Sequence, residues 1–164
     1  GSERIVRVMP NTPAMVGKGM SGLYAAPAVS ESDRQAAEAI LRAVGQTRWV
    51  ATEAGIDDVI AISGSGPAYV FHFVEALEAT GRQLGFDEAT ARELALATFE
   101  GAIELLRQSG EPAGDLKRKV MSKGGTTERA IASFEADGVA EAIVRGALAC
   151  RARAVEMSEE FSRS

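Results

Sequence analysis

The chain has 164 residues, enough for one domain with a hydrophobic core, or for one domain and part of another. Hydrophobic residues make up 46% and charged residues 25%, as in ordinary soluble globular proteins, and no apolar run is long enough to span a bilayer. The formal net charge of −5 argues against nucleic acid or an anionic membrane surface as the main partner.

The first residues predict a chain that has lost a preceding segment. Gly1-Ser2 is typical of the scar that a removed expression tag leaves, so it is excluded from the fold prediction. Residues 3–9 then alternate like a strand in the middle of a sheet, without any lead-in. We therefore expect a truncated protein.

Residues 4–52 predict a β-loop-β-α-β pattern, in which a loop rich in proline and glycine separates the first two strands. Three short strands are too few to form a sheet core of their own. The expected elements are strands over 4–9, 21–27 and 47–51, and a helix that Ser30 or Ser32 caps and Gly45 ends.

From about residue 53 the composition predicts almost continuous helix. Proline suits the first turn of a helix, aspartate suits the N-cap, and glycine suits the position after the last turn. The expected helices cover 56–62, 67–84 with Pro67 in its first turn, 87–108 with Asp87 as its cap, 116–121 after Pro112, a segment ending at 136, and 139–160.

Two of these helices carry apolar residues on more than one face. Residues 67–80 are apolar almost all the way round, and residues 90–106 combine an apolar side with a stripe of small residues. Helices of this kind must be surrounded by other elements, which about 110 helical residues can hardly provide. We expect a homodimer in which the small-residue stripe allows close helix approach; the alternative is a monomeric bundle. The stripe consists of Ala91, Ala95, Thr98 and Ala102.

Several catalytic sets are absent from the sequence. His72 is the only histidine, so a histidine-based metal site is excluded and there is little scope for a Ser-His-Asp triad; we expect His72 to be packed or half-exposed. Cys150 is the only cysteine; it fits a reducing cytoplasm and is expected to be buried and inert. The chain contains neither a phosphate-binding GxxxxGK[ST] loop nor a dinucleotide fingerprint.

Three loops remain as candidate sites: MPNTP (9–13), SGSGP (63–67) and SKGGTT (122–127). The last two lead into predicted helices, whose N-termini offer unpaired N–H groups to a carboxylate or phosphate. Gly124 and Gly125 would let the backbone approach such an anion closely. The residues alone equally allow a plain helix cap by Thr126, with Glu128 or Arg129 only decorating the first turn.

Three long segments resemble pyrroline-5-carboxylate reductases. They are RVMPNTPAMVGKGMSGLYA, DDVIAISGSGPAYVFHFVEAL and, after PAGDLKRKVM, SKGGTTERAIASFE, in the order and at the spacing of that family. The resemblance runs from about Arg4 to Glu160. Lys123 stands where the family usually has proline and Met121 where a small residue is usual, which puts the stiffness of this loop in doubt.

The resemblance implies a mainly α fold. Residues 53–164 would form a helical dimerisation domain of the 6-phosphogluconate-dehydrogenase-like C-terminal type. Residues 1–52 would be the β-α-β remnant of a Rossmann domain whose glycine-rich fingerprint is absent. A homodimer is expected, and rings of dimers are left open.

The resemblance also implies the reduction of 1-pyrroline-5-carboxylate to L-proline with NADPH or NADH, whose main binding site would lie in the missing part. The 122–127 loop would hold the substrate carboxylate, and the catalytic Thr127 hydroxyl would face the ring nitrogen. Glu111 is the nearest match to an acidic residue that contacts the amine in some relatives. The implied substrate-binding residues are Ser122, Gly124, Gly125, Thr126, Thr127, Ser63, Gly64, Ser65, Gly66 and Pro67; the implied cofactor-binding residues are Pro10, Asn11, Thr12 and Pro13; no metal is expected.

Two other functions remain open at this point. The chain could be a non-enzymatic helical dimerisation module in which the glycine loops are only caps. It could also belong to another dehydrogenase that acts on a different small acid.

Overall fold

The fold is described from a computed structural model, which covers residues 3–162, without the side chains of the last two. The predicted tag scar, Gly1-Ser2, lies outside the described residues. The chain forms two compact units, Gly1–Tyr69 with Val144–Ser164, and Val70–Ile143. Each unit is described by itself.

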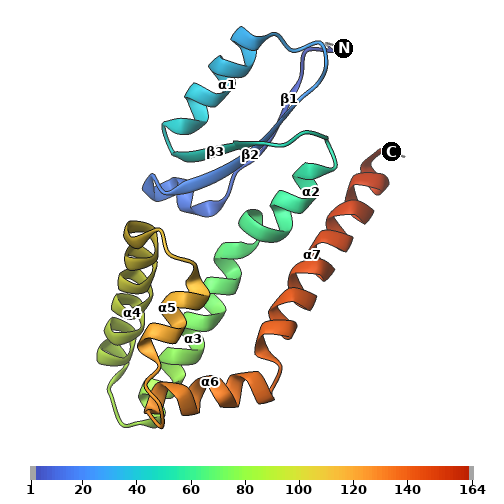
Figure 1. The fold of residues 1–164 in the computed structure, drawn as a ribbon. Coiled ribbons are helices and arrows are strands. Elements are labelled where there is room, and N and C mark those ends of the chain that lie inside the picture. The colour runs from blue at the N-terminus through green and yellow to red at the C-terminus, as the bar shows by residue number, and fades with distance from the viewer. Residues whose placement is uncertain (1–2, 163–164) are drawn as a thin grey trace. The chain divides into compact units, whose positions relative to one another are not determined.

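The first unit contains a three-stranded sheet with the order β1-β2-β3 (Figure 1). The pairing of β1 with β2 is antiparallel and that of β2 with β3 is parallel, with Leu23 opposite both Val8 and Trp49. The elements of this unit are β1 (Val6–Met9), a 3₁₀ helix (Thr12–Val16), β2 (Gly19–Ala25), α1 (Glu31–Arg42), β3 (Gly45–Trp49), α2 (Gly55–Val59) and a π-helix (Ile60–Gly64), together with the start of α3 and the C-terminal part of α7.

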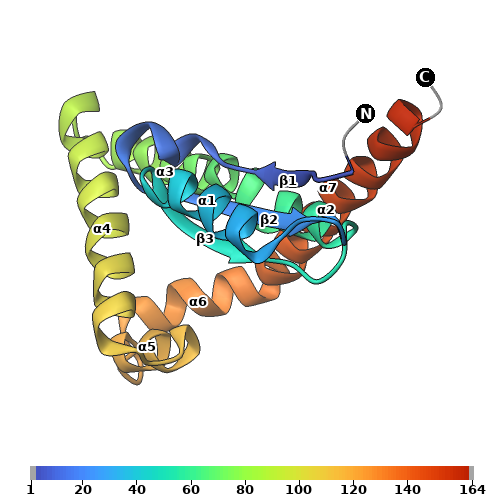
Figure 2. The same cartoon turned by 90° about the horizontal axis from the view of Figure 1, so that it is seen from above.

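Helices cover both faces of this sheet, α1 on one side and α2 on the other (Figures 1 and 2). Leu23 is fully buried, and Gly22, the residue before it in β2, lies against the side chain of Val59 in α2. The prediction that residues 4–52 are too few to form a sheet core of their own agrees with this, because α2 and other residues outside 4–52 complete the core. The buried core residues of the unit are Leu23, Ala25, Val29, Ile56, Ala61 and Ala154.

Strand β3 begins at Gly45, two residues before the predicted strand. A Cβ at this position would lie 2.1 Å from the carbonyl oxygen of Gly19, so the two strand backbones approach too closely for any other residue. The glycine that was predicted to end the preceding helix therefore also starts the strand, and the helix itself ends at Arg42.

Helix α1 is fixed to β3 by the Glu38 carboxylate. Its oxygens accept hydrogen bonds from Thr47 Oγ1 at 3.0 Å, from Trp49 Nε1 at 3.0 Å and from Arg42 at 2.7 Å. The bonds from Trp49, Arg42 and Thr47 lower the pKa of Glu38 to about 2, because each of them stabilises the charged form. On the same side, the Arg34 guanidinium lies over the Trp49 ring. Ser30 caps α1 by accepting from the N–H of Asp33, as predicted.

The second unit is entirely helical in its described residues. It contains most of α3 (Gly66–Gln83), α4 (Glu88–Ser109), α5 (Ala113–Val120), α6 (Thr126–Ala136) and the start of α7 (Val139–Ser162). Asp87 caps α4 as predicted, and its side chain accepts from the N–H of Thr90 at 2.7 Å. Helices α5 and α6 correspond to predicted helices, although α5 begins three residues earlier than predicted.

Part of the small-residue stripe is used within the chain. Ala91 and Ala95 are buried in α4, and a Cβ added at Gly81 of α3 would lie 2.8 Å from the Cβ of Ala91. Close helix approach therefore occurs between α3 and α4 of one chain, whereas we had expected it between two copies. No helix among the described residues is long and apolar enough to cross a membrane.

Candidate functional site

The 122–127 loop joins α5 to α6 with a tight turn. The N–H of Gly125 donates to the carbonyl of Ser122 at 2.8 Å, and Gly124 has a φ of +73°, in the left-handed region that favours glycine. A Cβ on Gly125 would lie 2.3 Å from Ser122 Oγ and 2.9 Å from its carbonyl oxygen. Both glycines are thus required by the local backbone.

Helix α6 begins without a side-chain cap. Its N-cap is Gly125, and Thr126 is its first residue, so the alternative in which Thr126 caps the helix does not apply. The amides of the first turn carry no side-chain cap and point out of the helix end. Thr127 is half-buried on this turn, and its hydroxyl has no hydrogen bond within the described part of the chain. These groups are available to a ligand.

The Glu128 carboxylate folds back onto the loop. Its Oε2 accepts from the N–H of Gly124 at 2.6 Å. The loop therefore already holds one carboxylate through a backbone amide. A hollow of about 410 Å³ lies here, lined by Gly124, Gly125, Glu128, Arg129 and Ala132. This bond was not predicted from the sequence, although glutamate at the third position of a helix is a known signal for a bond to the preceding loop.

The helix before the loop is rich in charge. Lys117, Arg118 and Lys119 occupy its last turn, and each pairs with a carboxylate. Lys119 contacts Glu111 at 2.5 Å and Lys117 contacts Glu135 at 3.4 Å, while Arg118 pairs with Asp115. Glu111, the weakest of the candidate ligands named from the sequence, is therefore held by Lys119 within its own unit.

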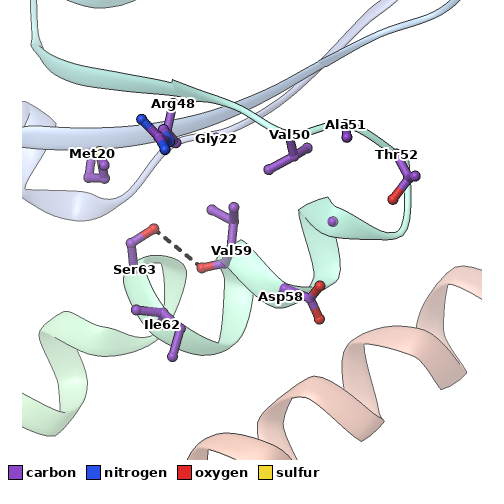
Figure 3. Close-up of a pocket in the computed structure, with 11 residues that line it drawn as sticks. Met20, Gly22, Arg48, Val50, Ala51, Thr52, Asp58, Val59, Ile62 and Ser63 are labelled. Carbon is purple, nitrogen blue, oxygen red and sulfur yellow. Dashed lines mark hydrogen bonds between the residues drawn. The ribbon is translucent and has the colours of Figure 1, made fainter.

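The SGSGP segment (63–67) lies in the other unit and begins in the last two residues of the π-helix. Residues 60–64 continue α2 with a wider turn, which the bond from the N–H of Ser65 to the carbonyl of Ile60 closes at 2.8 Å. The prediction of one ordinary helix over 56–62 was wrong at this point. Wide turns of this kind occur often at functional sites. The hydroxyl of Ser63 donates to the carbonyl of Val59 at 3.2 Å (Figure 3).

Asn11 joins the MPNTP loop to this π-helix. Its Nδ2 donates to the carbonyl of Ser63 at 2.9 Å, and its Oδ1 accepts from the N–H of Met20 at 2.8 Å. The structure thus brings two of the three predicted loops together, and both belong to the first unit. The 122–127 loop belongs to the second unit.

A mainly apolar cavity of about 490 Å³ opens beside the π-helix (Figure 3). Ser63 belongs to its lining, together with Met20 and Ile62, and Arg48 and Asp58 are the charged residues among the lining set. Asp58 is held by Arg151 at 2.5 Å. The remaining lining residues are Gly22, Val50, Ala51, Thr52, Gly55 and Val59.

Cys150 lies against the same segment. It is half-buried, and its Sγ lies 3.1 Å from the hydroxyl of Ser65 in a hydrogen bond whose direction is open. The Tyr69 hydroxyl is buried close by without a hydrogen bond of ordinary geometry. Burial, and after it the neighbouring Cys150, raise the pKa of Tyr69 above its usual range. The sequence predicted that Cys150 is buried and inert, and it did not predict the contact of Cys150 with Ser65.

His72 and the acidic residues are also possible metal ligands. His72 is exposed on α3, 3.8 Å from Glu75, and so is neither packed nor half-exposed as expected. Among the described residues no cluster of histidine, cysteine or acidic side chains could hold a metal ion.

Comparison with known proteins gives one family. Residues 53–157 match the family described as pyrroline-5-carboxylate reductase dimerisation. Over 158 residues the chain is 45% identical to the pyrroline-5-carboxylate reductase of Pseudomonas aeruginosa and 44% identical to that of Haemophilus influenzae. Each match covers 96% of this chain and 58% of the relative. The chain thus spans well under two thirds of these relatives.

Solved structures agree with these relatives. A pyrroline-5-carboxylate reductase from Coxiella burnetii matches with a TM-score of 0.88 and 41% identity, over 93% of this chain and 57% of that one. The Plasmodium falciparum pyrroline carboxylate reductase, solved with NADP bound, matches with a TM-score of 0.89 and 31% identity, over 93% and 62%. With most of its length matched in sequence and in fold, the chain belongs to the pyrroline-5-carboxylate reductase dimerisation family.

Proposed function

We propose that this chain is the substrate-holding and dimer-forming part of an enzyme that reduces 1-pyrroline-5-carboxylate to L-proline with NADPH or NADH. The observation that carries the proposal is the 122–127 loop, which presents two glycines and an uncapped helix end and already holds a carboxylate through an amide. The relatives of known name support the reaction.

The substrate carboxylate would bind at the start of α6. The first-turn amides and the positive end of the helix dipole favour an anion there. Ser122, Gly124, Gly125 and Thr126 would surround it, and the hydroxyl of Thr127, the second residue of the helix, would meet the ring nitrogen. A hydroxyl can donate or accept, so it can orient both the imine and the amine product.

The reaction needs alignment more than it needs a strong acid or base. A hydride is added to the carbon of the C=N bond, the π electrons move to nitrogen, and a proton on that nitrogen completes the amine. Holding the carboxylate at one end of the ring and the nitrogen at the other fixes the carbon that receives the hydride. Alignment of this kind requires neither a histidine base nor a metal ion.

The nicotinamide end of the cofactor would border the first unit. Bound NADPH or NADH would supply the hydride. Pro10 and Thr12 are exposed on either side of Asn11, which bonds to Ser63 of the 63–67 segment that would line the substrate pocket. The residues present can border a cofactor but offer no phosphate-binding fingerprint. We therefore propose that the main cofactor site lies in the part of the relatives that this chain does not span.

A second copy of the chain would cover the apolar helices of the second unit. Phe71 and Val70 of α3 are 64% and 46% exposed, and Leu96 and Ile103 of α4 are exposed as well. An apolar groove of about 580 Å³ runs between these helices. Large exposed apolar surfaces mark interfaces, and the family is one of dimerisation domains. We propose a homodimer through residues 53–164, with 1–52 as the tail of the nucleotide domain, and a cytoplasmic location.

The proposal is tested with the complete protein. Oxidation of NADPH or NADH should depend on 1-pyrroline-5-carboxylate, and L-proline should accumulate in equal amount. Reduction of a different small acid in its place would assign the chain to another dehydrogenase. Failure to reduce any of them, with a stable dimer, would make it a dimerisation module.

A further inference from the structure

Asn11 occupies a position where its side chain would ordinarily cap a helix. It is the N-cap residue of the 3₁₀ helix Thr12–Val16, and asparagine is among the best N-caps because its side-chain oxygen accepts from the first-turn amides. Here the side chain makes no such bond. Both ends of the carboxamide are directed elsewhere, to Ser63 and to Met20.

The carbonyl of Ser63 lacks its usual partner because of Pro67. In an α-helix this carbonyl would accept from the N–H four residues on, but proline has no N–H. The next possible donor, the N–H of Ala68, bonds instead to the carbonyl of Ser65 at 2.9 Å. Asn11 Nδ2 supplies the missing donor at 2.9 Å from a segment 52 residues away.

The second bond fixes the other end of the side chain. Asn11 Oδ1 accepts from the N–H of Met20, the second residue of β2, so the carboxamide is held between the strand and the π-helix. Met20 and Ser63 both line the cavity beside the π-helix, and Met9 reaches the same turn, since a Cβ on Gly64 would lie 3.0 Å from its Cε. The loop and the turn are therefore one packed unit around Asn11.

We propose that Asn11 is a positioning residue, which replaces the N–H that Pro67 lacks and so holds the π-turn at a fixed distance from the 10–13 loop. This inference rests on the proposed function, in which the loop borders the nicotinamide and Ser63–Pro67 lines the substrate pocket. Asn11 then aligns the hydride donor with the imine without contacting the cofactor through its side chain. It differs in this from the cofactor-binding role that the sequence resemblance implies.

The kinetic test uses the complete protein with Asn11→Ala, and Met15→Ala as the control, since Met15 lies in the same 3₁₀ helix and is 89% exposed. Asn11→Ala should lower kcat by about 10- to 100-fold, the cost of a small misalignment, and leave the KM for the nucleotide within about twofold. The isotope effect on kcat with nucleotide deuterated at the transferred position should rise. A raised nucleotide KM at unchanged kcat would make Asn11 a cofactor ligand and overturn the proposal, as would an unchanged kcat.

Rescue provides the sharper test. Asn11→Ala/Pro67→Ala restores an N–H at position 67, which can reach the carbonyl of Ser63 directly. Because Pro67 would itself line the substrate pocket, the loss of kcat caused by Asn11→Ala is measured with and without Pro67→Ala. The loss should be smaller when Pro67→Ala is present; an equal or larger loss contradicts the assigned role. If Asn11→Ala does not fold, Asn11→Asp keeps the acceptor for Met20 and replaces the donor to Ser63 by a carboxylate oxygen, which the Ser63 carbonyl repels, so kcat should fall at least as far.

Hydrogen exchange separates this inference from the proposed function. In Asn11→Ala the amides of residues 60–69 should exchange faster than in the parent protein, whatever reaction the protein catalyses. If the parent protein reduces no imine but exchange is faster in Asn11→Ala, the proposed function fails while the positioning role of Asn11 is supported. If exchange in Asn11→Ala is unchanged, the positioning role of Asn11 is refuted.

Discussion

The backbone N–H of Gly124 donates to the carboxylate of Glu128 at 2.6 Å. An anion of the chain itself thus occupies one amide of the loop to which we assign the substrate carboxylate. The two carboxylates would lie close together, and like charges repel. The Glu128 carboxylate would therefore repel an anionic ligand bound at this loop and weaken its binding.

Removing that charge should tighten substrate binding. Glu128→Gln keeps an oxygen for Gly124 but carries no charge, so the KM for 1-pyrroline-5-carboxylate should fall by roughly two- to fivefold, the size expected for an exposed charge pair. The effect should shrink at high salt because screening already weakens the repulsion. Glu159→Gln on α7 is the control. A higher KM for Glu128→Gln would show that the charge itself organises the loop.

A side chain at position 125 should abolish ligand binding without unfolding the protein. In Gly125→Val the new Cβ would meet Ser122 Oγ at 2.3 Å, so the loop must open and its amides must turn away. Calorimetry with L-proline should detect no binding. Gly114→Ala is the matched control, since its Cβ would meet only the flexible end of Arg118 at 3.6 Å. Normal binding by Gly125→Val would remove the loop from the site.

Charge on the exposed face of α3 should separate the two copies. Phe71→Glu places a carboxylate where the proposed interface is apolar, and a buried unpaired charge costs several kcal/mol, about enough to break a dimer at micromolar concentration. Light scattering should report a monomer. Ile40→Glu, at a 72% exposed position of α1, should leave the mass unchanged. A dimeric Phe71→Glu variant would place the interface elsewhere.

Acid should weaken the attachment of α1 to β3. The folded pKa of Glu38 is about 2, below its ordinary value of 4.5, so its stabilisation is complete above about pH 4.5 and is lost as the pH falls toward 2. The difference in melting temperature between the parent protein and Glu38→Gln should therefore be largest near neutral pH and shrink between pH 4.5 and 2. Glu31→Gln on the same helix, where the carboxylate accepts a hydrogen bond from the uncharged Gln35, should show little such trend. A difference independent of pH would contradict this account.

Much of the fold follows from local signals in the sequence. Asp87, Ser30 and Gly110 mark helix ends where the structure has them, because caps act through neighbouring backbone groups. The π-helix over 60–64 could not be predicted in this way. It depends on a wide-turn bond from Ser65 to Ile60 and on a donor from Asn11, 52 residues away.

The candidate site was predictable in composition but not in geometry. Two adjacent glycines before a helix allow an anion-binding loop and a plain helix cap equally, and the family resemblance implies the first and a role for Thr127. Neither reveals that Glu128 already bonds to Gly124, or that Cys150 contacts Ser65, since these contacts depend on side-chain direction and on packing between distant segments. The stripe of alanines was likewise visible, but only the structure pairs Ala91 with Gly81.

The most direct test of the central claim is the steady-state rate of Thr127→Ala in the complete protein, with Thr127→Ser as the matched variant. If the Thr127 hydroxyl meets the ring nitrogen, Thr127→Ala should lower kcat by about tenfold or more, and Thr127→Ser, which keeps the hydroxyl, should recover most of the rate. An unchanged kcat in Thr127→Ala would contradict the assignment of this loop to the reacting end of the substrate.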